Sequence, residues 1–165
     1  MNLSSDHWTA WFDRHSAALI LFAQQIVSQR SDAEDAVQEG FVRFWRNRQQ
    51  AEDSIAYLYT CVKRCALDQV RGSQRRRQRE QRASNARGQV YFVDTGQTEQ
   101  QRRSVEQALQ ILPEDQRQVV VLKVWGELTY AQIASALDIS PNTAASRFRY
   151  ALRRMRDQMD EAAIP

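Results

Sequence analysis

The stretch TYAQIASALDISPNTAASRFRYALRRMR, Thr129–Arg156, has the layout of a helix-turn-helix and decides how the rest of the chain is interpreted. Thr129 followed by Gln132 predicts a capping box at the start of a helix, and apolar residues then recur at helical spacing. A short turn follows. Ser140 is a suitable N-cap for a second helix, and Pro141 fits its first position, where the missing N–H has no helical partner. Two helices joined by a turn are therefore expected here.

The second of these helices has two distinct faces. Its expected apolar stripe consists of Ala144, Phe148, Ala151, Leu152, Met155 and Met159. Its other face has polar and basic side chains, namely Asn142, Thr143, Ser146, Arg147, Arg149, Arg153, Arg154 and Arg156. Hydrogen-bonding residues at the N-terminal end of such a helix suit the major groove of duplex DNA, and the later arginines suit phosphates. An αα-hairpin with a solvated basic face is the alternative.

The composition indicates an all-helical protein. The chain has 165 residues with only 5 Gly and 3 Pro, and its frequent Ala, Gln, Arg and Leu favour helices. The net charge is +3, yet acidic and basic residues are segregated along the chain. No stretch approaches the roughly 20 apolar residues of a membrane span, and the N-terminus lacks a signal-peptide pattern. We therefore expect a soluble, cytoplasmic protein that does not bind a membrane.

The residue pattern predicts no catalysis, no metal site and no cofactor. The sequence has no phosphate-binding glycine loop, no HExxH and no nucleophile elbow. Cys61 and Cys65 lie four residues apart in an expected helix, where the geometry for a disulfide is poor, so both are interpreted as small buried residues. His15 falls in an apolar stripe and is interpreted as a core or boundary residue. We expect a protein that is not an enzyme.

Three helices are expected in the first half of the chain. The first spans about 6–28, and the second spans about 32–48 behind a capping box formed by Ser31 and Glu34. The third spans about 54–71. The second helix begins acidic and ends basic, which complements the helix dipole.

The charge and apolar patterns divide the chain into two parts. We expect an all-α fold with two small helical domains, 1–75 and 102–165, joined by a flexible linker over 76–101. The basic run Arg71–Arg87 leads into this linker and can bind phosphate. The second domain contains the helix-turn-helix, after one helix that stops at Pro113 and another that Pro113 opens.

The third helix of the first domain offers a second candidate nucleic-acid surface. It mixes two tyrosines with basic residues, namely Tyr57, Tyr59, Lys63, Arg64, Arg71, Arg75 and Arg76. Aromatic side chains beside cations suit the unstacked bases and backbone of a single strand, whereas boundary packing is the plainer explanation for either tyrosine. One surface for melted DNA and another for duplex together indicate promoter opening.

Three blocks of the chain resemble bacterial RNA polymerase sigma factors of the extracytoplasmic-function (ECF) type. SDAEDAVQEGFVRFW (Ser31–Trp45) resembles the region 2 helix that docks on the polymerase clamp helices. SIAYLYTCVKRCALDQVRGSQRR (Ser54–Arg76) is similar to the segment that melts and reads the −10 element. The block Leu112–Arg156, which begins LPEDQR and contains SPNTAASR, resembles region 4, which reads the −35 element.

The resemblance implies a role for individual residues. Polymerase contact is expected of Asp35, Gln38, Glu39 and Arg43, and −10 binding of Tyr57, Lys63, Arg64, Arg71, Arg75 and Arg76. The −35 element is expected to contact Thr129, Asn142, Thr143, Ser146, Arg147, Arg149 and Arg153. Lys63-Arg64 replaces the Arg-Asn of many relatives, and Ala145 stands where many have Lys or Arg. The second departure moves the expected specificity to Asn142, Arg147 and Arg149.

The implied function is binding of core RNA polymerase, through its β′ clamp helices and β flap, followed by promoter-specific initiation. An anti-sigma factor is a possible further partner in such a family. Two other functions are compatible with the residues: a stand-alone helix-turn-helix regulator, and a sigma-mimic module that binds proteins without touching DNA. A regulator of the first kind would normally dimerise, and the chain has no obvious dimerisation helix.

Overall fold

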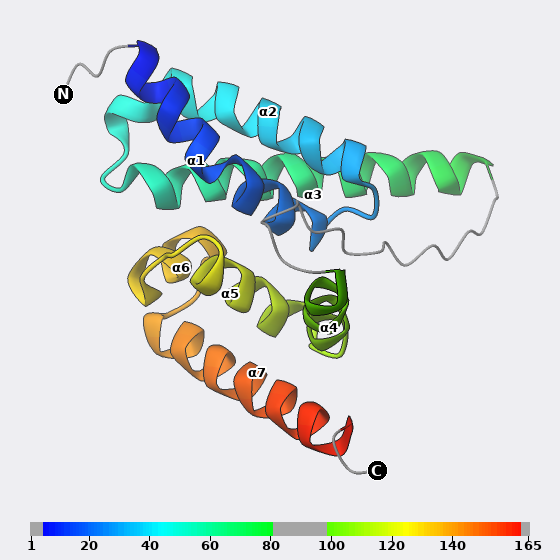
Figure 1. The fold of residues 1–165 in the computed structure, drawn as a ribbon. Coiled ribbons are helices and arrows are strands. Elements are labelled where there is room, and N and C mark those ends of the chain that lie inside the picture. Colours follow the sequence, from blue (N-terminus) through cyan, green and yellow to red (C-terminus); the bar gives the residue numbers. More distant parts are fainter. Residues whose placement is uncertain (1–4, 81–98, 163–165) are drawn as a thin grey trace.

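The computed structural model describes residues 5–80 and 99–162, and every regular element in these two ranges is helical (Figure 1). The elements are α1 (Ser5–Gln24), α2 (Arg30–Asn47), the 3-10 helix η1 (Arg48–Gln50), α3 (Ser54–Glu80), α4 (Glu99–Gln110), α5 (Glu114–Val124), α6 (Tyr130–Leu137) and α7 (Pro141–Ala162). The expected all-α class is confirmed. Most of the expected linker lies outside the described residues. Within the described ranges, no helix has the length and apolar character needed to cross a membrane.

Helices α1, α2 and α3 pack into an N-terminal helical group whose centre is aromatic and aliphatic. Trp8 and Trp11 of α1 meet Phe44 of α2, with ring centroids 5.7 Å apart in both pairs. Helices α2 and α3 approach very closely at Gly40, where a Cβ would lie 2.7 Å from Cγ2 and 2.8 Å from Cα of Val62. Glycine is needed here because any larger residue would force the two backbones apart.

The prediction of a capping box at the start of α2 is wrong. The helix begins at Arg30, behind an extended Gln29 whose side chain makes no capping hydrogen bond. Ser31 therefore lies inside the first turn. Glu34 does not reach back to a backbone N–H; its Oε1 accepts a hydrogen bond from Nε of Arg30, at 2.8 Å. An i,i+4 ion pair thus replaces the cap, because arginine at the first helical position offers the carboxylate a charged donor. Helix α1 ends at Gln24, four residues earlier than expected.

The helix-turn-helix is confirmed in its local details. The Thr129 backbone N–H donates to Oε1 of Gln132 at 2.9 Å, and Oγ1 of Thr129 accepts from the Gln132 N–H at 3.2 Å. Asp138 ends α6 in the left-handed region, with φ 58°. Oγ of Ser140 accepts from the Thr143 N–H at 3.0 Å, and α7 begins at Pro141.

Part of the apolar stripe expected on α7 is exposed. Leu152 and Met159 are 43% and 66% exposed, whereas Ala144 and Ala151 are fully buried. Helix α7 has 22 residues and packs on the shorter helices α4, α5 and α6, so its apolar residues that do not face these helices stay exposed.

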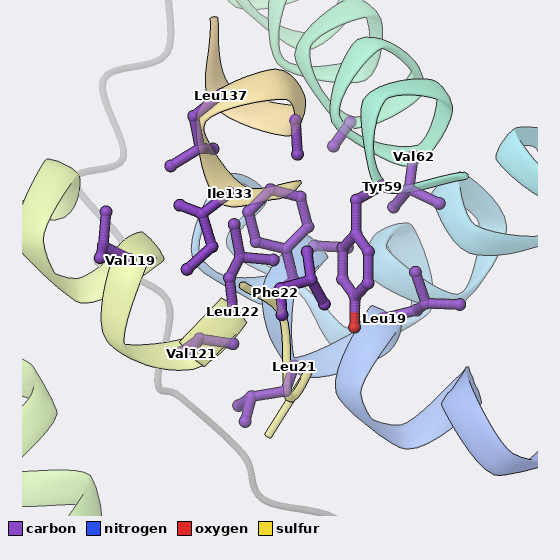
Figure 2. Close-up of a cluster of buried hydrophobic side chains, with 14 of the residues drawn as sticks. Leu19, Leu21, Phe22, Tyr59, Val62, Val119, Val121, Leu122, Ile133 and Leu137 are labelled. Atoms are coloured by element: carbon purple, nitrogen blue, oxygen red, sulfur yellow. The ribbon is translucent and has the colours of Figure 1, made fainter. Parts of the chain in front are cut away.

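The C-terminal helical group, α4–α7, packs against the N-terminal helical group through α5 and α6. Helix α5 contacts α1, and α6 contacts α3, while α7 lies on the far side (Figure 1). Figure 2 shows one apolar cluster formed by both groups, with Phe22 and Tyr59 beside Leu122 and Ile133. Leu21 to Gln24, the last four residues of α1, are all buried, which requires neighbours on every side of the helix end. The two groups are thus joined by a shared core as well as by the chain.

Candidate functional site

The expected polymerase-binding residues form the exposed face of α2. Asp35, Gln38 and Glu39 are exposed at helical spacing, and Val42 continues this face with 47% of its surface exposed. The opposite side of α2, at Gly40, lies against α3. Because tertiary packing fixes one side of the helix, the acidic residues are held outward as a single surface.

Arg43 ties this α2 face to α3. Its Nη2 donates to Oε1 of Glu39 at 2.5 Å, and its Nη1 donates to Oδ2 of Asp68 at 3.4 Å. The hydrogen bond with Glu39 is the main reason that the pKa of Arg43 is raised above its ordinary value. Asp68 also pairs with Arg71, at 3.6 Å. The expected polymerase-binding and −10-binding residues are therefore linked through Asp68, which the sequence interpretation did not include.

An open apolar groove runs beside the same α2 face, between α1 and α2. Trp8, Phe12, Phe41 and Trp45 line it, and Gln38 lies at its edge. The guanidinium of Arg48 at the end of α2 stacks on Trp45, with Cζ 3.7 Å from the ring centroid. The aromatic lining offers apolar contact area next to the exposed acidic residues.

The expected −10-binding residues lie on different faces of α3. Tyr57, Arg64 and Arg71 are seven residues apart and share one face, where the Tyr57 ring packs 6.1 Å from that of Phe44. Arg75 and Arg76 are exposed near the end of the helix. The residues of this candidate surface are thus divided between faces of α3, because Lys63 points away from Tyr57.

Lys63 faces the C-terminal helical group. Its Nζ donates to the Leu137 carbonyl oxygen at the end of α6, at 3.1 Å. Burial lowers the pKa of Lys63 from its ordinary value, and the nearby carboxylate of Asp138 partly opposes this change. Tyr59 is also on this side and is fully buried, which agrees with packing, the plainer explanation for this tyrosine, and excludes it from the exposed surface. Burial raises the pKa of its hydroxyl well above the ordinary value.

The expected −35-binding residues of α7 also separate into two sets. Asn142, Ser146 and Arg149 share one accessible face, with Nη2 of Arg149 donating to Oγ of Ser146 at 3.3 Å. Arg153 continues this face and lies 6.0 Å from the ring centroid of Tyr150. Arg147 instead turns toward α5, where its Nε pairs with Oδ2 of Asp115 at 3.2 Å.

Thr129 and Thr143 have local structural partners. The Thr129 side chain is part of the capping box of α6, and Oγ1 of Thr143 lies 2.9 Å from Oγ of Ser140. The Thr129 hydroxyl therefore caps the start of α6, and the Thr143 hydroxyl lies at the N-terminus of α7. The capping pattern in the sequence was sufficient to find this arrangement.

The two cysteines are buried and unbridged, as expected from their spacing. Burial raises the pKa of Cys65 to about 11, so its thiol stays protonated and unreactive at neutral pH. Within residues 5–80 and 99–162, no group of three or more His, Cys, Asp or Glu side chains is arranged to hold a metal ion.

Comparison with known protein families gives two matches along the chain. The model of the family described as Sigma-70 region 2 matches residues 11–76, and that described as Sigma-70, region 4 matches residues 102–155. Together these matches take up more than half of the chain.

Curated relatives and solved structures agree with these matches. The chain is 29% identical to the ECF RNA polymerase sigma factor SigK of Mycobacterium tuberculosis, over 91% of this chain and 84% of SigK. It is 27% identical to SigL of the same species, over 94% of this chain and 90% of SigL.

Among solved structures, the fold is similar to that of RpoE from Bartonella quintana in complex with the anti-sigma factor NepR. The TM-score is 0.74 at 22% identity, over 95% of this chain and 98% of RpoE. It is also similar to CnrH in complex with the cytosolic domain of CnrY, with a TM-score of 0.60 at 19% identity, over 96% and 90% of the two chains. The chain therefore belongs to the ECF group of RNA polymerase sigma factors, non-enzymatic proteins that bind polymerase and DNA and direct the initiation of transcription.

Proposed function

We propose that this sigma factor contacts its promoters at two places and core polymerase at two others. Residues 1–75 act as region 2, which binds the β′ clamp helices and the melted −10 strand. Residues 102–165 act as region 4, which binds the β flap and the −35 duplex, and 76–101 connect them. The observation that supports this division best is that α2 and α7 each have exposed polar side chains, namely Asp35, Gln38 and Glu39 on α2 and Asn142 and Arg149 on α7.

The α2 face is suited to protein contact. It combines the exposed carboxylates of Asp35 and Glu39 with the amide of Gln38 and an apolar residue, Val42, beside the aromatic groove. Apolar area rimmed by polar groups is typical of protein–protein interfaces. We assign this face to the clamp helices.

The α7 face is suited to duplex DNA. Asn142 lies at the helix N-terminus, where an amide can hydrogen-bond to an adenine edge, and Arg149 lies two turns later, where a guanidinium can reach a guanine edge or a phosphate. Arg153 follows one turn further on and suits the backbone. We assign base reading to Asn142 and Arg149, and assign Arg147 to phosphate contact after it leaves Asp115.

The proposal is tested by in vitro transcription from a genomic promoter library with purified core polymerase. We expect discrete transcripts only when the chain is added. Asp35→Arg should abolish most of this activity by placing a positive charge on the α2 face, whereas Asp13→Arg, the same charge change at an exposed α1 position, should leave it unchanged. Failure of the wild-type chain to bind core polymerase or support any transcript would overturn the proposal.

An anti-sigma factor is proposed as a further partner. The solved relative RpoE was crystallised with one, NepR. Copurification of the chain from its native host, followed by mass spectrometry, tests this for the present protein. We expect a second protein in stoichiometric amount besides polymerase.

A further inference from the structure

Helix α3 extends beyond the start of the helix that packs along it. It has 27 residues, whereas α2 has 18, and Figure 1 shows the C-terminal end of α3 running past the start of α2. On the side of α3 that faces α2, the buried residues Leu58, Val62 and Ala66 are followed at helical spacing by Gln69 and Ser73. This stripe therefore changes from apolar to polar near the point where α2 begins.

A cavity of about 610 Å³ lies there, between α3 and the turn that joins α1 to α2. Such a volume is typical of pockets that bind small molecules. Ile26 and Val27 of the turn and Val70 of α3 form its apolar lining, and its other lining side chains are polar or charged. Gln69, on the wall, has a buried amide oxygen without a hydrogen-bond partner among the described residues. A wall of this composition is unlike the core that α2 and α3 share.

Part of the lining is suited to a phosphate group. Arg76 and Arg77, near the C-terminal end of α3, contribute two guanidinium groups. Gln29, which also lines the cavity, is the N-cap of α2, and its side chain makes no capping hydrogen bond. The first backbone N–H groups of a helix have no partner within the helix and lie at the positive end of its dipole. Arginines beside a helix N-terminus are a favourable setting for a phosphate.

The rest of the polar lining is suited to a nucleobase and not to a second anion. Asp32, in the first turn of α2, contributes a carboxylate, and Gln69 and Gln74 contribute amides. An ionised carboxylate only accepts hydrogen bonds, so it matches two adjacent donors. Guanine offers such a pair at N1 and its 2-amino group, whereas adenine has an acceptor at N1 beside its 6-amino group. The apolar lining can cover the faces of the base.

We propose that this cavity binds a free guanine nucleotide, with the base at Asp32 and the phosphate between Arg77 and the N-terminus of α2. The apolar residues, the amides with the carboxylate, and the arginines then correspond to the faces of the base, its hydrogen-bonding edge and the phosphate. The ligand would bridge the start of α2 and the end of α3, and neither the polymerase-binding nor the −35-binding residues take part.

The cavity is separate from the face of α3 assigned to the −10 strand. Gln69 and Ser73 each lie two residues from Arg71, which is a rotation of about 200° around a helix. They are thus on the opposite side from the face formed by Tyr57, Arg64 and Arg71. A strand bound along that face does not need to enter the cavity. Arg76 is the one expected −10 residue that lines the cavity, so it is left unchanged in the tests.

Calorimetric titration of the full chain with GMP, AMP, guanosine and inorganic phosphate tests the choice of ligand. We expect GMP to bind about tenfold more tightly than AMP, because adenine cannot offer two donors to the Asp32 carboxylate. Asp32→Asn should remove this preference, since an amide has a donor of its own. Guanosine and inorganic phosphate should each bind more weakly than GMP. No binding of GMP, or equal affinities for GMP and AMP, would overturn the inference.

Arg77→Ala tests the phosphate contact. It should weaken GMP binding by about tenfold and leave guanosine binding unchanged, because only the phosphate interaction is lost. Arg79→Ala is the matched control: Arg79 is an exposed arginine in the same last turn of α3, outside the cavity lining, so GMP binding should not change. Equal losses in the two variants would mean general attraction to a basic helix and would overturn the inference.

A guanine within a DNA strand has the same recognition groups, so a competition separates the two sources. A guanine-containing single-stranded oligonucleotide is added to the chain saturated with fluorescently labelled GMP. We expect the label to stay bound, because the strand binds the opposite side of α3. Displacement of the label would assign the cavity to the promoter strand and would overturn the inference.

Hydrogen exchange of the wild-type chain covers the case in which a variant does not fold. Saturating GMP should slow exchange of backbone amides within 26–32 and 69–77, the two segments that line the cavity. Protection that is absent there, or that appears only in α7, would overturn the inference. None of these outcomes touches the proposed function, which transcription with core polymerase tests separately.

Discussion

The two sides of α3 make contacts of very different kinds. Toward α2, Val62 meets Gly40 so closely that no Cβ can be accommodated; the buried contacts are apolar, and the pair of Arg43 with Asp68 lies at the exposed edge. Toward α6, the contact has hydrogen bonds at both ends and encloses a tyrosine hydroxyl with no partner among the described residues. An unpaired buried hydroxyl destabilises the packed state by about 1–3 kcal/mol. This cost falls on the α3–α6 contact and not on the α2–α3 contact.

This difference indicates which contact is permanent. Close apolar packing gains nothing from partial opening, because every increment of separation loses dispersion contacts. The α3–α6 contact adds two hydrogen bonds to its part of the shared apolar core, and these polar groups can exchange their partners for water or for DNA. We therefore expect α3 to stay with α2 in all functional states and to part from α6 in some.

The strongest way to break the first contact is Gly40→Ala. The new Cβ would lie under 3 Å from Cα and N of Val62, which are backbone atoms and cannot turn away. We expect the free energy of unfolding to fall by about 3 kcal/mol. Thermal unfolding followed by circular dichroism measures the loss.

Gly72→Ala is the matched control for this prediction. Gly72 is also a helical glycine, but a Cβ there would meet no atom within 4 Å. The substitution should stabilise the protein by about 0.5–1 kcal/mol, since alanine favours the helix. Equal effects of the two substitutions would show that Gly40 is not a close-packing residue.

The second prediction contrasts the covered side of α3 with the accessible face of α7. Arg149→Ala should weaken binding of the free chain to its −35 duplex by about 1–3 kcal/mol, because a base or phosphate contact is lost without any opening step. Arg156→Ala, an exposed arginine further along α7, should have a smaller effect. Anisotropy titrations at fixed salt measure both, and a larger loss for Arg156→Ala would exclude Arg149 as a reader.

A smaller loss of stability is expected from the hydrogen bond between Gln132 of α6 and Asp53 at the start of α3. In a double-mutant cycle of Asp53→Ala and Gln132→Ala, each single change also removes a helix cap, since Asp53 Oδ1 accepts from the Ala56 N–H and Gln132 completes the capping box. The cycle cancels these local losses and leaves a coupling energy of about 0.5–1 kcal/mol. Chemical denaturation measures it, and strict additivity would mean that this hydrogen bond does not help to hold α6 on α3.

The smallest expected effect is a dependence of protein stability on pH through His15 of α1. Burial, and then Arg14, lower the pKa of His15 from its ordinary 6.5, while Glu127 partly opposes them. The unfolded chain therefore binds the proton more readily, so this residue reduces stability as the pH falls through 6.5 and not above it. The melting temperature of wild type should fall more than that of His15→Gln over this window. Identical pH profiles would contradict the shift.

Local patterns in the sequence were sufficient for much of the fold. The capping box at Thr129, the Ser140 cap and Pro141 at the start of α7 were predicted and are present, because each depends on residues within one helical turn. The exposed acidic side of α2 was also predicted. The capping box at Ser31 failed although its pattern was equally good, since an ion pair between Arg30 and Glu34 competed for the carboxylate.

The sequence by itself determined the helices, their order, the helix-turn-helix and membership of a DNA-binding family, because these depend on periodicity, caps and short motifs. Only the tertiary structure decided that Tyr59 is fully buried and that Lys63 hydrogen-bonds to the Leu137 carbonyl oxygen, in a distant part of the chain. It likewise decided that Arg147 pairs with Asp115 while Arg149 stays accessible. The physical reason is that burial depends on which elements pack together across long sequence separations, and helical periodicity contains no information about that partner.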